Sequence, residues 1–69
     1  MEKVKIKTDE IQLDQFLKWA NIVGSGGEAK NLIKSGIVKV NHVPEERRSK
    51  KLKKGDIVEV YNKQIQVDA

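Results

Sequence analysis

The chain from Leu13 to Gly36 reads LDQFLKWANIVGSGGEAKNLIKSG and contains two helical patterns separated by glycine. In the first pattern, apolar residues recur three and four positions apart, as along one face of a helix, which predicts a helix over about residues 13–21. In the second, Ser25 is followed three positions later by Glu28, a pairing that caps the start of a helix. Gly36 supplies the left-handed residue that commonly ends one. Two short helices joined by a glycine-rich turn predict a helical hairpin.

Short strand patterns flank this hairpin on both sides. Apolar and charged residues alternate over residues 3–7, which predicts a half-exposed strand. Behind the hairpin, β-branched residues predict strands at residues 37–40 and 57–61, and we expect these two to pair. A last short strand is expected at residues 64–67. The predicted fold class is therefore α+β, a helical hairpin packed on a small and mostly antiparallel β-sheet.

The segment between the two paired strands is predicted to be irregular. Pro44 forbids a regular central strand, and residues 44–54 are expected to form a long charged loop. Leu52 interrupts the charges of this loop and is expected to point inward and anchor it. We expect the core to consist of Val4, Ile6, Leu13, Phe16, Leu17, Ala20, Ile22, Ala29, Leu32, Ile33, Val38, Val40, Leu52, Ile57, Val58 and Val60.

Length and composition limit what the chain can be. Its 69 residues are expected to form one domain over residues 1–69. The absence of cysteine and the single histidine exclude a disulfide scaffold, a thiolate metal site and the usual multi-histidine metal cages. No apolar run approaches the roughly 20 residues that span a bilayer, and the N-terminus lacks the apolar stretch of a signal peptide. We therefore expect a cytoplasmic monomer with no cofactor, no membrane partner and no small-molecule substrate.

Basic residues are concentrated in one part of the chain. The sequence has 14 Lys and Arg against 10 Asp and Glu, and this net charge of +4 is by itself a weak indication of a polyanionic partner. From Arg47 to Lys54, however, six of eight residues are basic and none is acidic. Arginine can hold a phosphate with two parallel hydrogen bonds, so the run predicts contact with nucleic acid. The alternative is a solvated loop that Glu45 and Glu46 partly neutralise. The candidate contacts are Arg47, Arg48, Lys50, Lys51 and Lys53.

The glycine turn and the second helix supply the other candidate phosphate contacts. Backbone N–H groups at a helix start attract phosphate, and glycine lets a phosphate come close. Lys30 and Lys34 are four residues apart and therefore share one helix face. The alternatives are an ordinary capped turn and a solvated helix face. The candidate contacts here are Ser25, Gly26, Gly27, Lys30, Asn31 and Lys34.

Aromatic residues are scarce, since Phe16, Trp19 and Tyr61 are the only three. Proteins that bind single strands stack successive bases on aromatic rings, so this composition favours recognition of folded RNA by its shape and phosphates. For Trp19, at the edge of the apolar stripe, partial burial is favoured over base stacking. Catalysis has little support, because a nucleophile–base–orienter triad would have to use the single histidine, His42. We expect no enzymatic activity.

The spacing of these residues resembles that of a known family, the S-four-type RNA-binding domain with its αL motif. The resemblance runs from about residue 11 to residue 60. The stretch Ser-Gly-Gly-Glu-Ala-Lys and the short length are similar to the small stand-alone bacterial members related to the YaaA and YbcJ proteins. The residues that carry the resemblance are Leu13, Asp14, Ser25, Ala29, Leu32, Ile33, Gly36, Val38, Val40, Asn41, Ser49, Leu52, Gly55, Asp56 and Ile57.

The resemblance implies an RNA-binding surface formed by the helical hairpin and the β-hairpin loop that follows it. By position it implies roles for Ser25, Lys30, Lys34 and the loop around Arg47 and Arg48. It also implies ribosomal RNA, or the ribosome, as the partner and a role in ribosome assembly or maintenance.

Three positions depart from the family pattern. Many members have Arg at the positions of Gln12 and Gly26, and Gly at the position of His42. The basic run from Arg47 to Lys54 is a candidate replacement for the missing arginine charge.

The first hypothesis is therefore a non-catalytic protein that holds structured RNA, ribosomal RNA in particular, on a basic face. It requires that the lysines after the glycine turn and the arginines beyond Pro44 converge on one exposed surface. Two alternatives stay open. One is a protein-interaction adaptor whose basic loop binds an acidic partner, and the other is a double-stranded DNA binder that uses the second helix for recognition.

Overall fold

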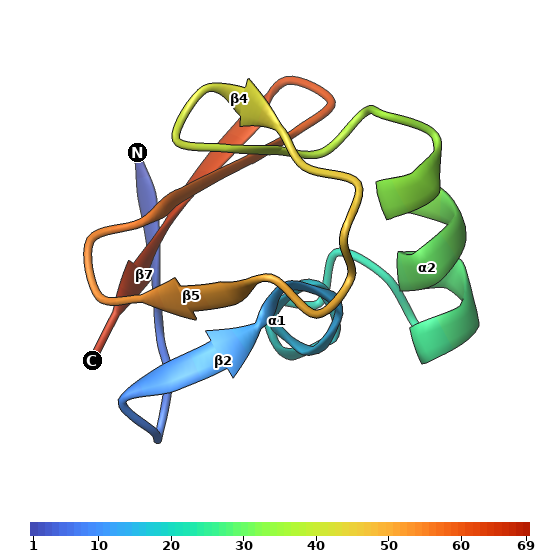
Figure 1. Cartoon of the computed structure of the whole chain (residues 1–69). Coiled ribbons are helices and arrows are strands. Elements are labelled where there is room, and N and C mark those ends of the chain that lie inside the picture. Colours follow the sequence, from blue (N-terminus) through green and yellow to red (C-terminus); the bar gives the residue numbers. More distant parts are fainter.

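Seven strands and two helices follow one another along residues 1–69, all of which the computed structural model describes (Figure 1). Five strands form one sheet in the order β1-β7-β6-β3-β4, and β2 and β5 form a separate antiparallel pair. In the larger sheet only β1 and β7 are parallel. The α+β class and the mostly antiparallel sheet are thus confirmed. The elements are β1 (Glu2–Lys5), β2 (Glu10–Gln12), α1 (Leu13–Trp19), α2 (Gly26–Lys34), β3 (Lys39–Val40), β4 (Val43–Pro44), β5 (Lys51–Lys53), β6 (Ile57–Val60) and β7 (Lys63–Asp68).

The helical hairpin forms where the sequence predicts it. The Ser25 hydroxyl accepts the backbone N–H of Glu28 at 3.2 Å, and the Glu28 carboxylate accepts the backbone N–H of Gly24 at 2.6 Å. The predicted start of the second helix at Ser25 and its side-chain cap are therefore confirmed, while the Glu28 carboxylate reaches one residue beyond the N-cap of a regular capping box. α2 ends just before Gly36, whose φ of +82° is the left-handed conformation that favours glycine. α1 ends at Trp19, two residues before its predicted end.

The expected pairing of the third and sixth strands is confirmed, with Val40 opposite Val58. Only two of the predicted residues 37–40 lie in β3, so this strand is shorter than expected. The N-terminal strand is present as β1 and runs parallel to β7, with Glu2 opposite Ile65. The alternating pattern predicts a strand but carries no information on its partner, which is why the parallel pairing was not predicted.

The prediction of one long loop over residues 44–54 was wrong. Pro44 ends β4, an edge strand in which a missing N–H costs no ladder bond, and β5 lies near the end of the same segment. In β5 only Leu52 is apolar, and it pairs with Ile11 of β2 across some forty residues of chain. Local sequence patterns do not reveal a strand of this kind, because its distant partner stabilises it.

The core lies between the helical hairpin and the sheets. Val23, Ile65 and Val67 are buried although they were not predicted, and the latter two lie on β7, which β1 turns into an interior strand. Of the predicted core, Val4, Ala20, Ile22, Leu32 and Ile57 are only half-buried. Neither helix has the length and apolar composition needed to cross a bilayer. The buried residues are Ile6, Leu13, Phe16, Leu17, Val23, Ala29, Ile33, Val38, Val40, Leu52, Val58, Val60, Ile65 and Val67.

Candidate nucleic-acid interface

The basic segment, residues 47–54, includes β5 and is fixed to the start of α1 by its backbone. The N–H of Leu13 donates to the carbonyl of Lys50 at 2.8 Å, and the N–H of Asp14 donates to the carbonyl of Arg48 at 3.1 Å. A helix leaves its first N–H groups without partners inside the helix, and the N-cap residue Gln12 makes no side-chain cap here. Backbone carbonyls of the basic segment therefore cap α1. The basic side chains of the segment take no part in this contact.

Arg47 is the arginine of this segment that has an internal carboxylate partner. Its Nε lies 3.3 Å from Oε2 of Glu45, and the same oxygen accepts the backbone N–H of Arg47 at 3.1 Å. Burial raises the pKa of Glu45, but the hydrogen bonds from Arg47 and the positive charges of Arg47 and the half-buried Lys50 outweigh it. They hold the pKa of Glu45 below its ordinary value. Glu45 therefore offsets part of the positive charge at Arg47.

Except for the half-buried Lys50, the other basic side chains of the segment face solvent. Leu52 is fully buried, so Lys51 and Lys53 on either side of it point outward from β5. The Nζ of Lys51 lies 3.4 Å from Oε1 of Glu10, whereas Arg48 is exposed and makes no ion pair within the chain. Arg48 is thus the arginine of this segment whose charge no carboxylate of the chain offsets.

The start of α2 offers two unpaired backbone N–H groups. The N–H groups of Gly26 and Gly27 have no hydrogen-bond partner in the chain. A Cβ added at either residue would meet no atom within 4 Å, so the fold does not require glycine at these two positions. The Ser25 hydroxyl is occupied by its bond to Glu28. The free N–H groups at this helix start fit an anion that approaches closely.

The glycine turn and the basic segment border the same part of α1. Gly26 lines a hollow together with Asp14, Gln15 and Lys18, and Asp14 is the residue whose N–H binds the carbonyl of Arg48. In Figure 1 the chain that leads into β5 passes beside α1 and faces α2. Lys18 was not among the predicted contacts, although its exposed place on α1 opposite the apolar stripe could have indicated it.

The predicted contacts on α2 lie on two different sides of the helix. Gly26, Lys30 and Lys34 are four residues apart and follow one line along its surface, on the side where Gly26 meets α1. Both lysines are exposed and make no ion pair. Asn31 instead lines, together with Leu32, a cavity on another side of the helix. The two lysines therefore share the side of the helix that Gly26 occupies, and Asn31 does not.

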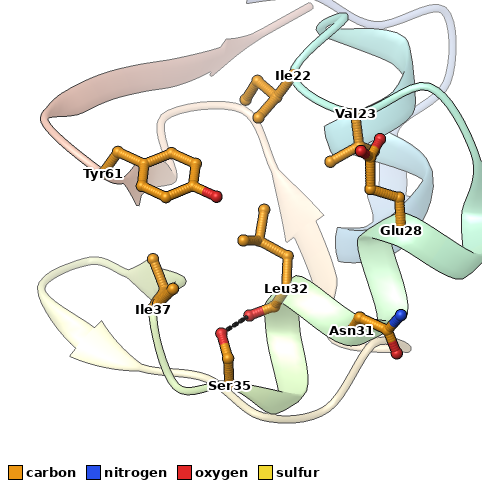
Figure 2. Close-up of a pocket in the computed structure, with 8 residues that line it drawn as sticks. All are labelled: Ile22, Val23, Glu28, Asn31, Leu32, Ser35, Ile37 and Tyr61. Carbon is orange, nitrogen blue, oxygen red and sulfur yellow. Dashed lines mark hydrogen bonds between the residues drawn. The ribbon is translucent and has the colours of Figure 1, made fainter.

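An apolar cavity of about 340 Å³ occupies that other side of α2. In Figure 2 the Tyr61 ring, Leu32 and Ile37 surround a common space. Tyr61 and Ile37 are 67% and 41% exposed, so this space is open to solvent.

Comparisons with known proteins identify relatives of the chain. A family model described as S4 domain matches residues 4–68. The chain is 46% identical over 57 residues to the probable ribosome maturation protein RlbA of Bacillus subtilis strain 168. The aligned segment covers 83% of this chain and 80% of that protein.

Two solved structures are similar to the fold. The solution structure of YbcJ from E. coli, described as revealing an αL motif involved in RNA binding, matches with a TM-score of 0.75 and 31% identity over 100% of this chain and 89% of YbcJ. The crystal structure of the 30S ribosomal protein S4e from Thermoplasma acidophilum matches with a TM-score of 0.63 and 18% identity over 84% of this chain and 31% of that protein. The second likeness concerns the fold alone.

Proposed function

The chain belongs to the S4 domain family, and on that premise we propose that it binds structured RNA, ribosomal RNA in particular, without catalysing a reaction. The names of its relatives support this proposal, because one is called a probable ribosome maturation protein and the other is described by an αL motif involved in RNA binding. We assign the chain a role in ribosome assembly or maintenance on the same grounds.

The observation that carries the proposal is the meeting of two distant segments on α1. Arg48 and Lys50 cap this helix through their carbonyls, and Gly26 lines a hollow with Asp14, the residue whose N–H binds the carbonyl of Arg48. The lysines of α2 extend the positive charge along the side of Gly26. We call the resulting surface the basic face, and it consists of Lys18, Gly26, Gly27, Lys30, Lys34, Arg47, Arg48, Lys50, Lys51 and Lys53.

Binding through this face should depend strongly on salt. Each phosphate that a protein neutralises releases counterions from the nucleic acid, so the affinity falls as the salt concentration rises. If about four phosphates are neutralised, log K should fall against log salt with a slope near −3. Titration of a folded ribosomal RNA fragment over a series of salt concentrations measures this slope, and a slope near zero contradicts the proposal.

Charge reversal tests where the RNA binds. Changing both Arg47 and Arg48 to Glu should weaken binding strongly and make the salt slope shallower, because two phosphate contacts become repulsive. The matched control changes Lys39 and Lys63 to Glu. Both lysines are exposed and lie on strands of the five-stranded sheet. Equal losses in the two double variants would show that total charge, and not the basic face, determines binding.

The two alternative functions are separated by their partners. The open apolar cavity beside Tyr61 favours a protein partner as the second candidate function. Pull-down with and without nuclease treatment decides this, because protein partners survive the loss of RNA. Competition between folded RNA and duplex DNA at equal salt tests the DNA alternative. If duplex DNA displaces the RNA, DNA is the preferred ligand, and if it does not, the DNA alternative is rejected.

A further inference from the structure

Trp19 is an aromatic side chain that the fold leaves accessible. It is the only tryptophan of the chain and the last residue of α1, and it is 49% exposed. The sequence favoured partial burial, and half of the side chain is indeed covered. The rest of the indole is open to solvent, where an aromatic ring offers both an apolar body and a π-face to a ligand.

The indole ring is held in one orientation. Its Nε1–H donates to the backbone carbonyl of Lys5 at 2.6 Å, which ties the end of α1 to β1. The Nζ of Lys7 lies 5.5 Å from the centre of the ring, within the range of a cation–π contact. A ring fixed in this way loses little conformational freedom when a ligand stacks on it. The ammonium lies over one face of the ring, so a base that stacks on that face displaces the Lys7 side chain.

Two adjoining hollows, of about 330 and 320 Å³, are lined by the ring. Ile11 and Gln15 line both of them, Lys18 lines the first, and Lys7 lines the second. The surface therefore combines an apolar floor and ring with two flanking ammonium groups. A nucleotide has the complementary character, because its base has an apolar face and its phosphates are anionic.

These hollows are continuous with the basic face at both ends. Gln15 and Lys18 also line the hollow at Gly26, where α2 begins. At the other end, Glu10 lines the second hollow and pairs with Lys51 of β5 at 3.4 Å. A nucleic-acid backbone that follows the basic face from α2 to β5 therefore passes the indole ring.

From this geometry we propose that Trp19 stacks on one unpaired base of the bound RNA, while Lys7 and Lys18 hold the phosphates on either side of that base. The proposal rests on the proposed function and names the structural feature of the RNA that this protein selects. A single base is expected, because the other exposed aromatic residue, Tyr61, lines the cavity on the far side of α2. The flanking cations favour a nucleotide over an apolar protein side chain as the occupant.

The test uses two short RNA hairpins at low salt, one with a fully paired stem and one with a single unpaired adenosine in the same stem. Tryptophan emission reports directly on Trp19, since no other tryptophan is present. The bulged hairpin should quench this emission and bind about 5- to 150-fold more tightly than the paired one, the range that stacking of one base provides. Trp19→Leu should abolish the preference, whereas Trp19→Phe should retain most of it.

Tyr61→Leu is the matched control, because it removes the other exposed aromatic ring and should leave the preference unchanged. If the preference survives Trp19→Leu, or if both hairpins quench the wild-type emission equally, the stacking proposal is overturned while RNA binding stands. If neither hairpin binds the wild-type protein at low salt, RNA binding itself is overturned. The fluorescence measurement on the wild-type protein remains decisive even if Trp19→Leu does not fold.

Discussion

Glu45 offsets part of the positive charge of the basic face at Arg47. Its carboxylate accepts both the backbone N–H and the side-chain Nε–H of Arg47. Arg47 is thereby held close to the backbone of its own loop, whereas Arg48 next to it has no carboxylate partner. Two adjacent arginines of the same run are therefore not equivalent, and Arg48 is the more available of the two for a phosphate.

The Glu45–Arg47 contact predicts a pH dependence of stability. Because the pKa of Glu45 is lowered in the folded state from its ordinary value of 4.5, the ionised carboxylate stabilises the fold above that pH. This contribution is lost as the pH falls through the lowered pKa. Glu45→Gln should therefore show a flatter decline of the free energy of unfolding on the acid side than the wild-type protein, as measured by urea unfolding between neutral and acid pH.

The matched control for this pH experiment is Glu46→Gln, since Glu46 is exposed and makes no ion pair. It should decline like the wild-type protein. The pair lies near the surface, so the difference at neutral pH should be less than about 1 kcal/mol. Identical acid profiles for all three proteins would mean that the contact does not exist in solution.

A substitution at Gly27 should change the stability of the fold and the affinity for RNA in opposite directions. Gly27→Ala should raise the free energy of unfolding by up to about 1 kcal/mol, because glycine is costly inside a helix and the added methyl group meets no atom. The same methyl group should weaken RNA binding, since it obstructs the approach of a phosphate to the free N–H groups. Thermal unfolding and RNA titration of one preparation measure both effects.

Gly36→Ala is the contrasting variant. Gly36 has a φ of +82°, so alanine there should lower stability and leave RNA affinity in the folded protein unchanged. Unchanged RNA affinity in Gly27→Ala would remove the start of α2 from the binding surface.

On the scale of the elements, two turn residues connect the two sheets. The Asn41 side chain donates to Asp56 Oδ1 at 3.2 Å and accepts the backbone N–H of Ile57 at 3.0 Å, and Asp56 Oδ2 accepts the backbone N–H of Lys53 at 2.9 Å. The turn between β3 and β4 is thus tied to the turn between β5 and β6. This clamp positions the end of β5, and with it the segment that caps α1.

Asn41→Ala and Asp56→Ala should each lower the free energy of unfolding by about 0.5–1.5 kcal/mol, because each removes hydrogen bonds that tie the two turns together. The two residues bind each other directly, so the double variant should lose less than the sum of the single variants. Denaturant unfolding of all four proteins measures this coupling. Strict additivity would contradict the role of the pair as one clamp.

The helices were predictable from the sequence because their signals are local. The Ser25–Glu28 pair, the apolar spacing and Gly36 lie within a few residues of the structure they determine. β5 gives no such signal, since Leu52 alone is apolar and its partner Ile11 is far away in the chain. The same limit applies to the parallel pairing of β1 with β7.

The sequence singles out the basic residues of the candidate site by their charge, but it does not show their arrangement. Nothing in the surroundings of Arg48 or of Gly26 shows that both border α1. That arrangement depends on backbone carbonyls, which every residue has and which no sequence pattern distinguishes. The one available indication was Gln12, a poor N-cap residue at the start of a clear helix, which implies that another group caps it.

On the scale of the whole molecule, β1 completes the sheet around a small core. Of the 69 residues only 14 are buried, so each edge of the sheet matters to stability. β1 covers β7, which carries the buried Ile65 and Val67, and the chain just after β1 adds the buried Ile6. Its Lys5 carbonyl also holds the Trp19 ring.

A variant without residues 1–6 should therefore lose cooperative unfolding and tend to aggregate, because β7 becomes an open apolar edge. Circular dichroism during heating and size-exclusion chromatography measure the two effects. The control is Lys3→Ala, which changes an exposed side chain of β1 and keeps the strand. A cooperative transition at the wild-type midpoint in the shortened protein would show that β1 is dispensable.

The parallel pairing of β1 with β7 also determines at which terminus an affinity tag or surface linker is best attached. In a parallel pair the two strands start at the same end, so Glu2 lies opposite Ile65. The last residues of β7 therefore lie beside Ile6, whose N–H donates to the carbonyl of Asp68 at 2.8 Å. An affinity tag or surface linker fused behind Ala69 emerges beside Ile6, one residue before the Lys7 of the proposed stacking site. Immobilisation through the amino terminus avoids that end of the molecule.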